Sequence, residues 1–281
     1  MKFIKKGSGI VKAPIQELQN LVKEELYDGN SFNADIFNEY GIFVLREFLN
    51  VEYLKEFIDL YFNSIDEGVI VKDAYHKTQV KIDMIPEFNE IAHSDEFIKL
   101  SKMIYQTSAA VDFYRIVKKD SNNYAAVFPH QDSCYSIGNF NSTSIFIALT
   151  NSGPDNGGLK LYPGTKNFGH TGDAGTLNLE ILPEGYPSIS PYLQVGDALI
   201  MNSGTWHESP ESETKEPRVY LEFQIRDGKD PAARDYIFGS DSRRWVINMT
   251  VDEIYLDSRE QRLVRLYKHN AELLKKINTF E

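Results

Sequence analysis

The sequence has a single cysteine, no excess of positive charge and no long apolar run. Cys134 is the one cysteine among 281 residues, which excludes an internal disulfide and is typical of a reducing compartment. The formal net charge of −11 argues against nucleic acid or an anionic membrane as the main partner, because no basic surplus is present to neutralise phosphates. No stretch approaches the roughly 18 apolar residues of a membrane-spanning helix, and no apolar run follows the basic start, so we expect no signal peptide. These absences predict a cytoplasmic protein.

Apolar side chains recur at helical spacing in the first third of the chain, and short apolar runs follow from about residue 111. The helical spacing predicts helices at 14–26, 51–64 and 95–110, and the same spacing near the end of the chain predicts a closing helix at 258–278. A short apolar run predicts a strand at 41–45. Glycine, proline, asparagine and aspartate separate the expected strands, at 111–117, 125–128, 144–149, 158–162, 197–201 and 218–225. Many short strands with such punctuation indicate an all-β sandwich or barrel.

Three polar residues in this β-rich part carry metal-ligand chemistry. His130 and Asp132 are two residues apart, so on an extended backbone both side chains point to the same face. His207 follows the expected strand at 197–201 and also lies near a strand end. Two imidazoles and one carboxylate are the set with which a mononuclear iron(II) oxygenase holds its metal by one face. Each signal is weak alone, since His-x-Asp is common on surfaces and a lone histidine is often a hydrogen-bonded core residue.

An arginine opens the last strongly β run. Arg218 stands eleven residues after His207. If it points into a β core it needs an anion to offset its desolvation, and the carboxylate of an organic acid would serve. The alternative is an edge residue paired with Glu222 or Glu216.

Residues 128–226 resemble the phytanoyl-CoA dioxygenase family of iron(II)/2-oxoglutarate oxygenases. The matching segments are His130-Gln131-Asp132, Asn156-Gly157-Gly158-Leu159 with Pro163-Gly164-Thr165, Gly196-Asp197, His207-Glu208-Ser209 and Arg218 at the family's usual offset. The segment at 40–45 is similar to the family's N-terminal strand, so the likeness runs from about residue 35 to 230. The sequence departs from the family at one position of the Pro-Gly-Ser/Thr-His motif. Lys166 stands where the family has histidine, and the nearest histidine is four residues later, at His170.

The resemblance implies a double-stranded β-helix, or jelly-roll, core that is mainly β with flanking helices. It implies that His130, Asp132 and His207 ligate iron(II). Because Asp132 keeps the carboxylate ligand, no position is vacated for chloride, and hydroxylation is favoured over halogenation. Desaturation and ring closure stay open.

The resemblance also implies 2-oxoglutarate and O2 as co-substrates, with succinate and CO2 released. Arg218 would bind the distal carboxylate of 2-oxoglutarate, with help from the Ser209 hydroxyl, and Phe146 would line the co-substrate pocket. We expect a small-molecule substrate, which the sequence does not name, and it leaves the oligomeric state open. Candidate substrate-pocket residues are Tyr135, Cys134, Trp206, Gln79 and Lys81, each of which has a structural or solvated alternative.

Without internal repeats or evident linkers, one domain over residues 1–281 is the economical interpretation. Residues 1–110 would form mainly helical support and a pocket wall, residues 111–230 the jelly-roll core with the metal site, and residues 231–281 a C-terminal helical segment. Two alternative functions use the same scaffold. One is a cupin-like isomerase or hydrolase with another metal at the His/Asp/His set, and the other is a non-catalytic jelly-roll binding protein.

Overall fold

A computed structural model describes most of the chain, in two compact units. The described residues are 15–66, 79–81, 86–120, 124–135, 141–170, 176–214, 216–233, 235–239 and 259–277. The first unit is Met1–Arg244 and the second is Trp245–Glu281. All the strands belong to the first unit, and the described part of the second is one helix.

The helices of the first unit come early and the strands follow. The helices are α1 (Ile15–Lys23), α2 (Ala34–Tyr40), α3 (Val51–Asp66) and α4 (Asp95–Tyr105), with 3-10 helices η1 (Pro86–His93), η2 (Asp132–Tyr135), η3 (Pro154–Asn156), η4 (Thr165–Phe168) and η5 (Leu179–Ile181). The strands are β1 (Asp28–Gly29), β2 (Ile42–Leu45), β3 (Gln79–Lys81), β4 (Ala109–Lys119), β5 (Val127–His130), β6 (Ser142–Ala148), β7 (Lys160–Tyr162), β8 (Ala198–Asn202), β9 (Trp206–Ser209), β10 (Arg218–Asp227) and β11 (Asp235–Phe238).

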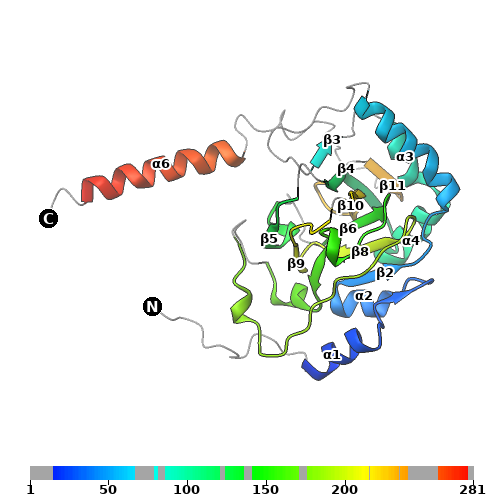
Figure 1. The fold of residues 1–281 in the computed structure, drawn as a ribbon, viewed down its shortest axis with the longest axis horizontal. Coiled ribbons are helices and arrows are strands. Elements are labelled where there is room, and N and C mark those ends of the chain that lie inside the picture. The colour runs from blue at the N-terminus through cyan, green and yellow to red at the C-terminus, as the bar shows by residue number, and fades with distance from the viewer. Residues whose placement is uncertain are drawn as a thin grey trace. The chain divides into compact units, whose positions relative to one another are not determined.

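The strands form two sheets. The larger has the order β1-β2-β8-β6-β10-β4-β11, with β3 also paired to β4, and the smaller has the order β5-β9-β7. In Figure 1 the helices α2, α3 and α4 lie on one side of the larger sheet, and β5 and β9 lie on the other. This is a mainly β fold with flanking helices and a double-stranded β-helix core, which confirms the expected fold class.

Strand β10 has two different faces, because successive side chains of a strand point to opposite sides. Its apolar face carries Val219, Leu221, Phe223 and Ile225, all within the main hydrophobic cluster. Its polar face carries Arg218, Tyr220, Glu222, Gln224 and Arg226. On this polar side Tyr220 packs in a second cluster with Phe146 of β6 and Leu161 of β7, so the face looks toward the smaller sheet.

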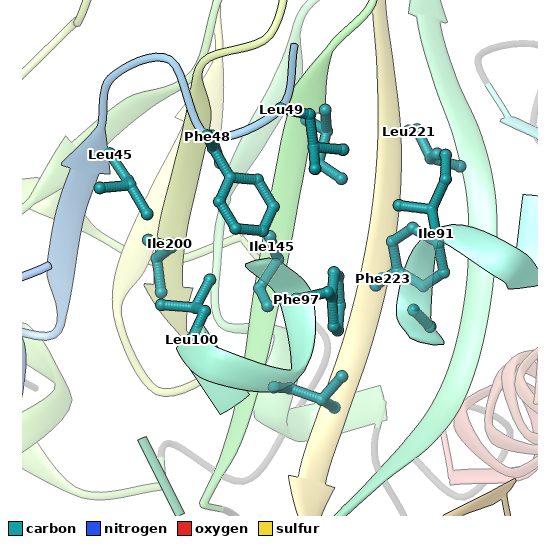
Figure 2. Packing of buried hydrophobic residues seen from close by; sticks show 14 of the residues in the cluster. Leu45, Phe48, Leu49, Ile91, Phe97, Leu100, Ile145, Ile200, Leu221 and Phe223 are labelled. Atoms are coloured by element: carbon teal, nitrogen blue, oxygen red, sulfur yellow. The ribbon is translucent and has the colours of Figure 1, made fainter. Parts of the chain in front are cut away.

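Helix α4 covers the apolar face of the larger sheet. Figure 2 shows Phe97 and Leu100 directed toward Ile145, Ile200 and Phe223. The rings of Phe97 and Phe223 meet edge to face, with centroids 5.0 Å apart. Burial of each such side chain is worth about 1.5–3 kcal/mol, so this layer supplies much of the stability of the fold.

The helix expected over residues 95–110 ends earlier than predicted. It begins at Asp95, where the Ser94 hydroxyl caps the amide of Phe97, and it ends at Tyr105. Gln106 has a positive φ of 60°, which breaks the helix. Ala109 and Ala110 then pair with Asp227 and Arg226 of β10, so sheet pairing overrides their helical propensity.

The other expected elements occur with shifted ends. Helices are present at α1, α3 and α6, and strands at β2, β4, β6, β7, β8 and β10. The strand expected at 125–128 runs from Val127 to His130 instead. Leu26 lies beyond the end of α1 and is 46% exposed. Patterning located the elements, but it did not fix where each one ends.

The described part of the second unit is α6 (Arg259–Ile277). Its side chains at Val264, Leu266 and Tyr267 are exposed. The side chains of its other large apolar residues, at 263, 273, 274 and 277, lie outside the described set. Within the part of the chain that the structure describes, no helix combines the length and the apolar character that crossing a membrane requires.

Candidate metal centre

The three residues singled out as metal ligands come together in the first unit. His130 ends β5 and lies directly opposite His207 of β9 in the smaller sheet, with ring centroids 4.3 Å apart. Oδ1 of Asp132 lies 3.5 Å from Nε2 of His130 and 3.7 Å from Nε2 of His207. One potential ligand atom from each residue lies within 4.8 Å of the others, so a single ion can contact all three.

Local backbone geometry differs from the expectation at two of these residues. His207 is not at the end of the preceding strand but within a strand of its own, β9. Asp132 is not extended, because it begins the 3-10 helix η2. The pairing of β5 with β9 is irregular between Val127 and His130, where Pro129 has no N–H to donate. The turn at Asp132 brings its carboxylate between the two imidazoles.

Both imidazoles are oriented by a backbone carbonyl two residues earlier. Nδ1 of His130 lies 2.8 Å from the carbonyl oxygen of Phe128, and Nδ1 of His207 lies 3.0 Å from that of Thr205. A carbonyl only accepts, so Nδ1 carries the proton and Nε2 keeps its lone pair. Such outer contacts fix the tautomer and orientation of a metal-binding histidine.

The protonation states of His207 and Asp132 also suit a cation. Burial, reinforced by His130, lowers the pKa of His207 to about 4, so this imidazole is neutral at physiological pH. Burial by itself raises the pKa of Asp132, but His207 and His130 outweigh it and hold that pKa well below its usual range. The pair therefore offers a neutral nitrogen and a negative oxygen, the forms that bind a metal.

Two further side chains support the ligands. The hydroxyl of Ser144, on β6, donates to Oδ2 of Asp132 at 3.3 Å. The buried amide of Gln131 donates to the carbonyl oxygens of Gly169 and Gly204, at 3.0 and 2.7 Å. Because Gly204 lies three residues before His207, the Gln131 amide ties the turn that carries one ligand to the segment that carries the other two.

Arg218 lies on the polar face of β10 and is 1% exposed. Its Nη2 lies 3.5 Å from Oγ of Ser209, and its guanidinium stacks on Tyr220 with 4.5 Å to the ring centroid. Nε and Nη1 are buried without a hydrogen-bond partner among the residues that the structure describes. Burial lowers the pKa of Arg218, but a guanidinium starts so high that it stays charged. The edge alternative is wrong, since Glu222 pairs with Arg115 instead.

Ser209 links this arginine to the histidine strand. Ser209 and His207 are both in β9 and, two residues apart, they point to the same side. The Ser209 hydroxyl donates to the carbonyl of Gly157 at 2.8 Å. Gly157 has a φ of +75°, and a Cβ there would lie 2.6 Å from Cδ of Lys119. Glycine is required at this position because a side chain would displace a buried lysine.

The comparison with known families decides which proteins this chain is related to. The model of the phytanoyl-CoA dioxygenase (PhyH) family matches residues 37–220, more than half of the chain. The chain belongs to the phytanoyl-CoA dioxygenase family. None of the curated proteins compared with it matches.

Solved structures with the same fold are distant in sequence from this member of the phytanoyl-CoA dioxygenase family. EctD from S. alaskensis, with 2-oxoglutarate and 5-hydroxyectoine, has a TM-score of 0.62 at 13% identity and covers 86% of this chain and 84% of its own. The epimerase SnoN with Fe3+, alpha ketoglutarate and nogalamycin RO has a TM-score of 0.60 at 15% identity, over 78% of this chain and 94% of its own. The carbocyclase SnoK from nogalamycin biosynthesis gives 0.59 at 15% identity, over 70% and 83%.

Two of the phytanoyl-CoA dioxygenase motifs have scaffold roles in this structure. Asp197, of the Gly-Asp pair, accepts from Nη1 of Arg46 at 2.6 Å and from the backbone amide of Glu47 at 2.9 Å. The side-chain oxygen of Asn156 accepts from the amide of Gly153 at 2.8 Å. Both residues fix turns at strand ends, so they position the sheets without contacting the ligand set.

The remaining site candidates lie at varied places. Phe146 is buried on β6 and contacts Tyr220 edge to face, with ring centroids 5.8 Å apart. Trp206 is also buried, and it packs against Phe168 in a separate cluster. Because Trp206 and His207 are adjacent in β9, they point to opposite sides. The pocket roles of both aromatics stay predictions.

Two pairs of substrate-pocket candidates are placed only by their backbone. Cys134 and Tyr135 lie in η2, directly after Asp132. Gln79 and Lys81 form β3, where they pair with Val117 and Arg115 of β4. Their proposed roles stay predictions as well. His170, the displaced histidine of the glycine-rich turn, has Nδ1 3.3 Å from Oγ of Ser133.

Sequence reasoning missed three polar residues of this region. Lys119 is fully buried, and its Nζ donates to the carbonyl oxygens of Ser209, at 3.0 Å, and Pro210. Ser144 and Glu222 are buried on the side of the larger sheet that faces the ligands. A signal was present in β10, where polar residues alternate with apolar ones over residues 218–226. That alternation predicts a strand with one polar, functional side.

Proposed function

We propose that this chain is an iron(II)/2-oxoglutarate-dependent dioxygenase that hydroxylates a C–H bond of a small molecule. The observation that carries the proposal is the buried, partly unpartnered guanidinium of Arg218 beside the strand that holds His207. A buried cation with unsatisfied donors is costly unless an anion completes it. An enzyme that binds a dicarboxylate next to its metal has a use for such a group.

The ligand set fits iron(II). Two neutral imidazole nitrogens and one carboxylate oxygen are the facial set of non-haem iron(II) oxygenases, which leaves open positions for other ligands. His130, Asp132 and His207 would hold the ion. The carbonyls of Phe128 and Thr205 orient the two imidazoles, and the Ser144 hydroxyl orients the carboxylate.

The surrounding residues fit 2-oxoglutarate as co-substrate. Arg218 presents a planar fork that matches a carboxylate, and Ser209 adds a hydroxyl beside it. Phe146 and Tyr220 supply an apolar wall. Two of the similar structures named above were solved with these ligands, SnoN with Fe3+ and alpha ketoglutarate and EctD with 2-oxoglutarate, which supports the same pairing here.

Iron(II) with 2-oxoglutarate supplies the oxidising chemistry when bound, since O2 is reduced, one oxygen atom enters succinate and the other enters the product. The protein's part is to position substrate and to exclude water. Because Asp132 is present as the third ligand, we propose hydroxylation. We propose that the substrate is a small metabolite and that the protein works in the cytoplasm.

A cupin-like isomerase or hydrolase would use the same three ligands. That chemistry has no use for a buried guanidinium next to the ligand strand, two of whose nitrogens lack a partner among the described residues. A non-catalytic jelly-roll protein has no need for a complete ligand set. Arg218 and the intact triad therefore favour the oxygenase.

The experiment is anaerobic addition of Fe(II) and 2-oxoglutarate, followed by visible absorption. We expect the weak charge-transfer band of a metal-chelated keto acid. Arg218→Ala should raise the 2-oxoglutarate concentration needed for this band by about 10–100-fold, because charge-assisted hydrogen bonds contribute about 1.5–3 kcal/mol. Fe(II) binding itself should persist in this variant.

The control is Arg265→Ala, which removes the same charge from an exposed position on α6. It should leave the 2-oxoglutarate titration unchanged. Absence of the band in the unmodified protein, or an unchanged titration in Arg218→Ala, would overturn the co-substrate assignment.

A further inference from the structure

Glu222 is a buried carboxylate that the fold does not fully satisfy. It lies on the polar face of β10 and is 0% exposed. Oε2 accepts from Nε of Arg115 at 2.5 Å. Oε1 is buried and has no hydrogen-bond partner among the described residues. A buried carboxylate oxygen without a donor costs about 1–3 kcal/mol or more, so this oxygen indicates a missing ligand group.

The free oxygen belongs to the region of the metal centre. Glu222 is opposite Phe146 of β6 in the sheet register, and Phe146 is two residues from Ser144, which donates to Asp132. Successive even positions of a strand share one face, so Glu222, Arg218 and Ser144 lie on the same face of the larger sheet. The electrostatics of Glu222 agree with this placement. Burial raises its pKa and Arg115 opposes the rise, while Asp132 raises the pKa further and the nearby Ser144 hydroxyl lowers it.

A purely structural role does not explain this arrangement. The nearby Arg226 lies on the same face and is held by two carboxylates, Asp112 and Asp230. Among the described residues Glu222 forms one printed ion pair, with Arg115, and its Oε1 has no hydrogen-bond partner.

We propose that Oε1 of Glu222 is the acceptor that anchors an N–H or O–H group of the substrate beside the metal centre. The proposal rests on the proposed function and narrows its substrate to a molecule with a hydrogen-bond donor, an amine or a hydroxyl. Arg115 fixes the carboxylate through Oε2, so that Oε1 stays in place.

The experiment uses three four-carbon probes with the protein loaded with Mn(II) and 2-oxoglutarate. Butylammonium carries N–H donors, 1-butanol carries an O–H donor, and 2-butanone only accepts. Bound Mn(II) accelerates the relaxation of protons near it, so NMR relaxation of the carbon-bound protons reports binding at the metal centre. We expect either donor probe, or both, to bind at least about tenfold more tightly than 2-butanone, which corresponds to one hydrogen bond.

The decisive variant is Glu222→Gln, which keeps the shape and reverses the polarity. An amide has one acceptor oxygen, and Arg115 must take it, so the amide NH2 group replaces Oε1. Donor probes should then weaken about tenfold and 2-butanone should strengthen. If Glu222 only stabilised the fold, the substitution would not shift the binding preference from donor probes to 2-butanone. Glu216→Gln makes the same change at an exposed position before β10 and should alter nothing.

Each result bears on the proposal separately from the proposed function. If no donor probe is relaxed in the unmodified protein, or if Glu222→Gln binds donors within twofold of it, the proposal is overturned. If 2-oxoglutarate fails to bind but the donor preference depends on Glu222, the proposed function fails and the anchoring site stands. Should Glu222→Gln not fold, Glu222→Asp withdraws the carboxylate by one methylene and should weaken the donor probes without strengthening 2-butanone.

Discussion

The two faces of β10 differ in what they do for the protein, although they belong to the same ten residues. The apolar face packs Leu221 and Phe223 against α4 and its neighbours. The polar face buries Arg218 and Glu222, which have two nitrogens and one oxygen, respectively, without a hydrogen-bond partner in the described part of the chain. One face stabilises the fold, and the other keeps groups that are costly without a ligand. In this strand, residues that stabilise the fold alternate with residues that suit a binding role, because successive side chains point to opposite faces.

The difference also predicts how variants behave. Changes on the polar side and at the ligands it supports should alter binding while the protein stays folded. Changes on the apolar side should alter stability while the site of each folded molecule keeps its affinity. The two classes can be tested independently, because metal affinity is measured on the folded fraction and unfolding is measured on the whole population.

The largest effect is expected for Asp132→Ala. The variant leaves two neutral imidazoles and no anionic ligand, so Mn(II) affinity should fall by more than about 100-fold, since even outer contacts of a metal ligand are worth about 10–100-fold. Mn(II) titration followed by electron paramagnetic resonance measures the loss. The circular-dichroism spectrum should be unchanged, because the apolar face is intact.

Asp155→Ala is the matched control, since Asp155 is exposed in η3. It should retain the affinity of the unmodified protein. Mn(II) affinity within threefold of normal in Asp132→Ala would show that the ligand set is wrongly assigned.

The next effect is expected for Leu221→Ala, on the apolar face. Leu221 is fully buried in the main cluster, and removal of such a side chain lowers the free energy of unfolding by about 2–5 kcal/mol. Urea denaturation measures it. Leu26→Ala makes the same substitution at a leucine that is 46% exposed and should cost less than about 0.5 kcal/mol. A large loss of Mn(II) affinity per folded Leu221→Ala molecule would contradict the separation of the two faces.

A smaller, pH-dependent effect is expected at Lys119. Burial and the neighbouring Arg218 lower its pKa to about 8 in the folded state, from 10.5. Between these values the unfolded chain binds more protons than the folded one, so the contribution of Lys119 to stability rises with pH across this window and is least favourable below pH 8. The free energy of unfolding of the unmodified protein, minus that of Lys119→Met, should rise by about 2–3 kcal/mol between pH 8 and pH 10.5.

Thermal or urea unfolding of both proteins at several pH values measures this difference in the free energy of unfolding. Tyrosines that titrate in the same range contribute equally to both proteins, so their contributions cancel. Lys118→Met serves as the control for loss of a lysine from β4, since Lys118 pairs with Asp120. A difference for Lys119→Met that stays flat across the window would show that the buried amine keeps an ordinary pKa.

The sequence indicated the metal set because local patterns there are strong. His130 and Asp132 are near neighbours, and the strand that contains Arg218 alternates clearly. The fold class followed from the many short runs with turn residues between them. The end of α4 was misjudged because the positive φ at Gln106 is not visible in the spacing of apolar residues. The end of β5 was misjudged because the strand continues past Pro129 to pair His130 with His207, and spacing does not reveal such a pairing.

Contacts between distant segments could not be read from spacing. The pairing of Arg115 with Glu222 depends on the register of β4 against β10, and nothing near Glu222 in the sequence specifies that register. Lys119 has the same limitation, because its acceptors at Ser209 and Pro210 are far along the chain. A buried charge is recognised as such only when its partners are known.

Because His130 and His207 lie opposite each other, an ion bound at this centre would cross-link two segments that are far apart in the sequence. The two residues bracket β6, β7 and β8 along the chain, so a bound metal would close a long loop and restrict the unfolded ensemble, as a cross-link does. The three-stranded sheet would then be the part of the first unit most readily opened when iron is scarce. Protease resistance of residues 124–214 should therefore track metal supply, and the turnover of the protein in a cell would follow the iron status of that cell.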